Sequence, residues 1–111
     1  MEKLERYRKY VEDIVKEYGQ YKASYGNIER QIVIDRERDH YQLWSVGWIG
    51  DRRIRGCSLQ IDIKDPKIWI QHDGTEFGIA DELAEMGVPK EDIVLAFHAP
   101  YKRKYTGFAV E

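Results

Sequence analysis

The sequence predicts an α+β fold: an N-terminal helix, a four-stranded antiparallel meander, a second helix and a short C-terminal strand. Three observations lead to this prediction. Apolar residues recur at helical spacing over residues 3–21, the apolar period changes to two between residues 28 and 72, and helical spacing returns over residues 74–86. A chain of 111 residues is long enough for one modest core, so residues 1–111 are expected to form a single domain.

The first predicted element is an amphipathic helix over residues 3–21. Acidic residues precede basic ones by four positions on its polar face, an order that stabilises helices: Glu5 with Lys9, and Glu12 with Lys16. The apolar stripe consists of Leu4, Tyr7, Val11, Ile14, Val15 and Tyr18. The stretch YGQYKASYGN, residues 18–27, contains two glycines and is predicted to be the loop that follows.

Residues 28–72 are predicted to form the four strands of the meander. Apolar residues alternate in the first strand, at Ile28, Ile32 and Ile34. The second strand, YQLWSVGWI, is apolar on both faces, which suits a central strand or one whose outer face meets a helix or a partner. Its two faces are formed by Leu43 on one side and by Trp44, Val46 and Trp48 on the other.

The third strand is expected to alternate between an apolar and a polar face. The apolar face would hold Cys57, Leu59, Ile61 and Ile63, and the polar face Ser58, Gln60 and Asp62. Gly50-Asp51 before this strand is a good two-residue hairpin signal, and KDPK after it is a turn because Pro66 has no amide donor for a sheet. KIWIQ then returns as the fourth strand.

A second helix is predicted over roughly residues 74–86, with Ile79, Leu83 and Met86 on its buried side. Gly87 and Pro89 end it, since glycine is common just after a helix and proline cannot continue one. DIVLAF is a short apolar strand. The tail HAPYKRKYTGFAV is expected to add a last extended piece.

Composition excludes several classes of protein. Apolar residues make up 42% of the chain and charged residues 34%, a globular balance, and the net charge of −2 argues against bulk electrostatic binding of nucleic acid. The single cysteine cannot form an internal disulfide. The charged N-terminus is not a secretory signal, and no apolar run approaches a membrane helix, so the protein is expected to be soluble and cytoplasmic.

The stretch WIQHDGTEFGIADEL crowds acidic residues and a histidine where a strand passes into a helix. Asp73 and Glu76 are three positions apart, as in a capping box, where each carboxylate accepts from a backbone amide at the helix start. We therefore interpret them as structural caps. One histidine, His72, beside a carboxylate is weak support for general base chemistry.

A second candidate site is Asp62-Ile63-Lys64 on the third strand. A D-x-K pattern on a strand is typical of metal-dependent nucleases, with Asp39 or Asp35 as the further carboxylate. Polar residues are also common at a strand end before a turn, and this is the better reading. A nuclease using Asp62 and Lys64 stays an alternative.

Other reactive residues are scattered. His40, His72 and His98 have no metal-ligand spacing, Cys57 is expected to be a buried core thiol, and no glycine-rich phosphate loop precedes a helix. No catalytic residue, metal site or cofactor is therefore predicted.

The basic cluster YKRKY places Lys102, Arg103 and Lys104 between Tyr101 and Tyr105. Basic residues beside aromatic rings can contact phosphates while the rings stack on bases, so direct DNA binding is a further alternative. A solvated basic turn is the simpler reading.

Several long stretches of the chain resemble the XisI family of fdxN-element excision controlling factors, found mainly in cyanobacteria. They are RERDHYQLWSVGW, IDIKDPKIWIQHDGTEFGIADEL, GVPKEDIVLAFH and YTGFAV, and they extend from near Tyr25 to the end. The family stretch GFHSP stands here as AFHAP, residues 96–100.

The resemblance implies an α+β domain that helps to control excision of a DNA element in heterocyst development. A separate recombinase cuts the DNA in that process, and the family is often paired with XisH, a nuclease-like protein. The leading hypothesis is a non-enzymatic accessory factor that contacts an XisH-like partner. Trp48, Tyr101 and Arg103 are the predicted contact residues, chosen by residue type, and a homo-oligomer through the same aromatic surface is also expected.

Overall fold

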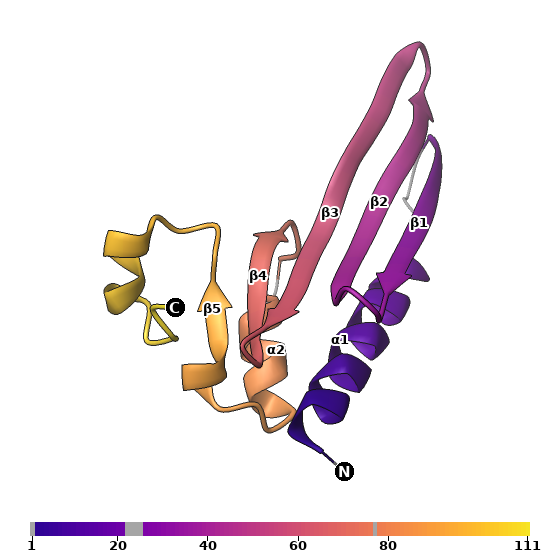
Figure 1. The fold of residues 1–111 in the computed structure, drawn as a ribbon. Coiled ribbons are helices and arrows are strands. Elements are labelled where there is room, and N and C mark those ends of the chain that lie inside the picture. The colour runs from indigo at the N-terminus through magenta and orange to yellow at the C-terminus, as the bar shows by residue number, and fades with distance from the viewer. Residues whose placement is uncertain (1, 22–25, 77) are drawn as a thin grey trace.

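The computed structural model describes residues 2–21, 26–76 and 78–111. Helix α1 (Lys3–Gly19) is followed by the antiparallel strands β1 (Asn27–Asp35), β2 (His40–Ile49), β3 (Arg52–Lys64) and β4 (Lys67–Asp73). Helix α2 (Ile79–Glu85), a 3-10 turn η1 (Lys90–Asp92), strand β5 (Ile93–Leu95) and a 3-10 helix η2 (Pro100–Tyr105) complete the chain. The α+β prediction is confirmed (Figure 1).

The sheet follows the chain in the order β1-β2-β3-β4-β5, so the predicted meander is confirmed. β5 pairs parallel to β4, because α2 carries the chain back to the starting end of that strand. The two predicted turns occupy the residues between β2 and β3 and between β3 and β4, where Gly50 and Asp65 have φ of 58° and 68°. Residues 22–25 of the predicted loop after α1 lie outside the described residues.

The core lies between one face of the sheet, called here the inner face, and both helices. Leu43, Leu59, Ile61, Ile63, Ile68 and Ile70 of the strands are buried against Tyr7, Val11, Ile14 and Val15 of α1 and Ile79, Ala80 and Leu83 of α2. The apolar stripe predicted for the first helix is therefore the face that packs. Figure 1 shows the helices grouped along one part of the sheet, with the β2–β3 hairpin extending away from them.

Two β-bulges interrupt the sheet. Leu43 lies opposite Leu59 while Trp44 lies opposite Cys57, so Ser58 is an extra residue in β3. The extra residue shifts the alternation of β3, and Cys57 shares the face of Trp44. The prediction that Cys57 faces the core with Leu59 is wrong: its thiol is half-buried, and Sγ donates to the Leu59 carbonyl at 3.0 Å.

The second bulge is in β4. Ile61 lies opposite Ile70 and Gln60 opposite His72, so Gln71 is the extra residue. It turns the Gln71 amide toward Asp62, and Nε2 donates to Oδ2 at 3.2 Å.

Within the described residues, no helix is long and apolar enough to span a membrane.

Candidate functional site

The outer face of the sheet, opposite the helices, carries all three tryptophans. Leu43 beside Trp44, and Ile68 and Ile70 beside Trp69, are buried on the inner face, and successive side chains of a strand alternate. Trp48 follows Trp44 by four residues in β2, so it lies on the same outer face. The outer side chains that gather along β2, β3 and β4 are Trp44, Val46, Trp48, Arg53, Arg55 and Trp69. We call this set the tryptophan face.

A cation lies over each indole ring of the tryptophan face. The guanidinium of Arg55 is 5.3 Å from the ring centroid of Trp44, and Arg53 is 5.3 Å from that of Trp48. The ammonium of Lys64 is 4.1 Å from that of Trp69. Such contacts hold the rings in place while leaving the cations near solvent. The tryptophan face is therefore aromatic and basic, although the chain is acidic overall.

The three predicted contact residues do not form one patch. Trp48 is 48% exposed near the end of β2, and Tyr101 is 70% exposed in η2, at the opposite side of the molecule (Figure 1). Trp44 was predicted to share the face of Trp48 but was not chosen as a contact residue, and Trp69 was missed as a companion. The signal was in the sequence, since Trp69 lies between Ile68 and Ile70, two core residues of one strand.

Arg103 holds the C-terminal tail against the sheet. Its Nε donates to the His98 carbonyl at 3.0 Å and its Nη2 to the Ala96 carbonyl at 3.3 Å. Its guanidinium also lies 5.8 Å from the ring centroid of Trp69. Lys102 and Lys104 are exposed in η2 instead. The predicted basic cluster thus divides into one structural arginine and two solvated lysines.

The nuclease residues do not converge in the fold. Asp62 Oδ1 pairs with Nδ1 of His40 at 2.8 Å on the outer face. Asp39 instead accepts a hydrogen bond from Arg8 of α1 at 2.8 Å. Burial would raise the pKa of the Asp39 carboxyl, but hydrogen bonds from Arg8 and Tyr41 outweigh burial and lower that pKa. Asp35 accepts from the backbone amides that follow it. Among the described residues, no group of three carboxylate, histidine or cysteine side chains has the geometry for a metal ion.

The interpretation of Asp73 and Glu76 as a capping box is wrong in its geometry. α2 begins at Ile79 with Gly78 as its N-cap, so neither residue occupies a capping-box position. The Asp73 carboxylate, at the end of β4, accepts hydrogen bonds from two backbone amides that follow it. Oδ1 accepts from the Thr75 amide at 2.9 Å, and Oδ2 accepts from the Ile79 amide at 2.8 Å. One carboxylate thereby still satisfies the first helical amide, six residues away.

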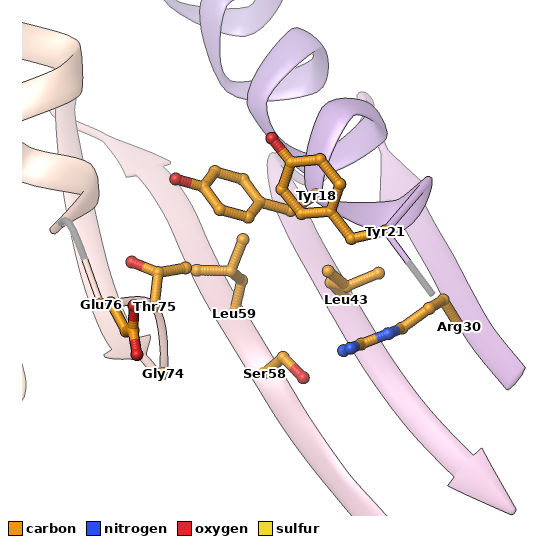
Figure 2. Close-up of a pocket in the computed structure, with 9 residues that line it drawn as sticks. All are labelled: Tyr18, Tyr21, Arg30, Leu43, Ser58, Leu59, Gly74, Thr75 and Glu76. Atoms are coloured by element: carbon orange, nitrogen blue, oxygen red, sulfur yellow. The ribbon is translucent and has the colours of Figure 1, made fainter. Parts of the chain in front are cut away.

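Glu76 instead lies at the rim of a pocket on the inner face. The pocket has a volume of about 230 Å³ and is lined by Tyr18, Tyr21, Arg30, Leu43, Ser58, Leu59, Gly74, Thr75 and Glu76. Figure 2 shows the two tyrosine rings over Leu43 and Leu59, with Thr75 and Glu76 on the opposite side from Arg30. Burial and the carboxylate of Glu82 raise the pKa of Tyr18 to about 12.

Arg30 reaches from the first strand across the inner face. Its Nη1 donates to Oγ of Ser45 at 2.9 Å, and that hydroxyl lies 3.2 Å from Oγ of Ser58, the bulged residue. Its Nε is buried with no hydrogen-bond partner among the described residues. This polar row marks where the apolar core under α1 ends.

Comparisons with known proteins place the chain in a family. Residues 1–110 match the family model described as XisI protein. A crystal structure of a XisI-like protein from Anabaena variabilis ATCC 29413 is 46% identical, superposes with a TM-score of 0.91, and the match covers 98% of this chain and 100% of that one.

A second crystal structure, of the fdxN element excision controlling factor XisI from Anabaena variabilis ATCC 29413, is 36% identical. It superposes with a TM-score of 0.86 over 99% of this chain and 100% of that one. No curated protein matches the sequence. The match of nearly the whole chain, in sequence and in fold, shows that this protein belongs to the XisI family.

Proposed function

We propose that this protein is a non-enzymatic accessory factor in the control of DNA excision, and that it acts by binding an XisH-like protein through the tryptophan face. A structural neighbour that is 36% identical is an excision controlling factor, which supports the role. The single observation that carries the binding surface is the gathering of three cation-capped tryptophans on a sheet face that neither helix covers.

The chemistry of the tryptophan face suits a protein partner. Tryptophan and arginine are enriched among the residues that contribute most to protein interfaces, because they bury a large flat surface and keep polar groups for hydrogen bonds. Trp48 and Arg53 face each other across β2 and β3, and Trp48 is half-exposed. An acidic patch on the partner would complement Arg53 and Arg55.

Co-purification with an XisH-like protein tests the proposal. We expect a complex at micromolar concentrations, and we expect Trp48→Ala to weaken it by about tenfold or more, as loss of a central aromatic anchor does. Tyr105→Ala is the matched control, since Tyr105 is 78% exposed in η2, on the other side of the molecule from the β2–β3 hairpin that carries Trp48 (Figure 1).

Two outcomes would contradict the proposal. The absence of any complex at micromolar concentrations would remove the partner, and equal binding by Trp48→Ala and the unsubstituted chain would remove the tryptophan face. Tyr101→Ala separates the two candidate surfaces, because a larger effect there than at Trp48 would place the contact on η2.

A further inference from the structure

Strand β1 is an open edge of the sheet. Within the described residues it pairs with β2 alone, and the pairing runs without a bulge from Asn27 opposite Trp48 to Asp35 opposite His40. The other edge is closed differently: β5 has three residues, and the tail lies beside it, with the Ala109 amide donating to the Ile93 carbonyl at 2.9 Å. A regular nine-residue edge presents backbone donors and acceptors that another strand can pair with.

Two exposed apolar side chains on β1 point to opposite faces of the sheet. Ile32 is 43% exposed and Val33 is 44% exposed, and consecutive side chains of a strand alternate. A partner that packs on one face of the sheet would cover only one of them. A strand that lies alongside the edge would cover the flanks of both.

The charged residues of β1 do little to block such pairing. The guanidinium of Arg30 is turned back across the sheet to Ser45, away from the edge. Glu29 accepts from Nε2 of Gln31 at 2.9 Å, so these two side chains lie along the strand. β1 contains no proline and no bulge, which are the common devices that protect an edge.

The sequence of β1 is complementary to itself in antiparallel orientation. A two-fold axis at Gln31 pairs all nine residues and sets no like charges directly opposite each other. The facing residues of the two copies are then Asn27 with Asp35, Ile28 with Ile34, Glu29 with Val33, and Arg30 with Ile32.

The neighbouring registers are worse. Side chains that face each other across the two copies must lie on the same face of the joined sheet. The two-fold axis can therefore pass only beside a residue, and the neighbouring registers shift it by one residue in either direction. At Arg30 the axis would set two guanidinium-bearing residues opposite each other, and at Ile32 it would set Glu29 opposite Asp35. Like charges directly opposite destabilise a strand pair, which favours the axis at Gln31.

We propose that a second copy of this chain adds its β1 to this edge, so that the two five-stranded sheets join into one sheet of a two-fold homodimer. The axis is perpendicular to the sheet, which keeps both inner faces on one side. The two tryptophan faces would then lie on the other side and form one surface. The dimer does not depend on the proposed partner, because the edge and the tryptophan face are different surfaces.

Sedimentation velocity of the full chain at micromolar concentrations, together with cysteine cross-linking, tests the proposal. In a Cys57→Ser background, Gln31→Cys places the two thiols next to the axis, where Cβ atoms are about 5 Å apart. Mild oxidation should then give a disulfide-linked dimer. Gln31 is exposed on β1, so the substitution leaves the core intact.

Two variants on the same face serve as matched controls. Glu29→Cys and Val33→Cys each lie two residues from Gln31, so identical copies would hold their thiols about 14 Å apart, too far for a disulfide. Each alone should give about tenfold less cross-linked dimer than Gln31→Cys, whereas an equal mixture of the two should cross-link, because Glu29 faces Val33 across the axis.

A monomer in sedimentation would overturn the proposal. A dimer in which Gln31→Cys cross-links no better than Glu29→Cys would also overturn it, since the copies would then meet elsewhere or in another register. Cross-linking of Gln31→Cys to the XisH-like protein in place of a second copy would assign the edge to that partner. Complex formation by a chain that stays monomeric would leave the proposed function intact and remove the dimer.

Discussion

The hydroxyl of Tyr7 donates to Oδ2 of Asp92 at 2.5 Å, joining α1 to η1 across 85 positions of the chain. The same carboxylate accepts from the ammonium of Lys3 at 2.8 Å. Asp92 is 8% exposed, and Tyr7 is 2% exposed in the core. This buried polar pair holds the N-terminal part of α1 against η1, the turn that leads into β5.

Tyr7→Phe should therefore destabilise the protein by about 1–2 kcal/mol, because it leaves a buried carboxylate with one donor fewer. Chemical denaturation monitored by circular dichroism measures the change. Tyr10→Phe in the same helix is the control, since Tyr10 packs only partly against the core. Equal effects of the two substitutions would show that the bond to Asp92 adds no stability.

The acid stability of the protein should depend on Asp92. Burial alone would raise the pKa of its carboxyl, but the hydrogen bonds from Lys3 and Tyr7 outweigh burial and hold the pKa below its ordinary value. A lowered folded-state pKa stabilises the fold above the unfolded-state pKa of about 4, and that stabilisation is lost as the pH falls through the folded-state value. The free energy of unfolding should thus fall below about pH 4. Denaturation at several pH values should show a shallower fall in Asp92→Asn.

Arg103→Ala should lower the free energy of unfolding by about 1–3 kcal/mol, because the guanidinium satisfies carbonyls of the tail and packs over Trp69. Lys104→Ala, one residue along, should change it by less than about 0.5 kcal/mol, as expected for an exposed side chain. Thermal denaturation compares the two variants directly. A neutral Arg103→Ala would show that the tail is held by its apolar contacts alone.

Any binding of duplex DNA by the basic cluster should depend weakly on salt. With Arg103 engaged by the tail, Lys102 and Lys104 remain for phosphates, and two contacts give a slope of log K against log salt of about −2. Fluorescence anisotropy over a salt series measures this slope. A steeper slope that Lys102→Ala leaves unchanged would assign DNA binding to another surface. An affinity that does not change with salt would exclude the basic cluster as the DNA-binding site.

Asp62→Asn and Lys64→Arg should leave the proposed excision control intact, since arginine keeps a cation over Trp69. Asp62 is paired with His40 and Gln71, and the Lys64 ammonium lies over Trp69, so each side chain already has a partner within the protein. Excision of the DNA element in cells that carry each variant is the measurement. If both substitutions abolish excision control while the variants remain folded, the nuclease alternative is supported instead.

The sequence by itself determined the α1 stripe, the order of the strands and both short turns, because each depends on residues close together in the chain. Apolar period and turn chemistry are local properties, and α1 and the meander follow from them. The membership in the XisI family was likewise carried by contiguous stretches of sequence.

Only the tertiary structure decided where the side chains of the candidate sites point. The bulge at Ser58 turned Cys57 away from the core, and alternation alone could not place that extra residue. The start of α2 moved to Ile79 because Asp73 reaches its amide across a loop. Arg103 became structural because it donates hydrogen bonds to carbonyls of the folded tail. The tail pairs beside β5, so among the described residues β1 is the edge that stays open. Each of these depends on contacts between distant residues, which a local pattern does not contain.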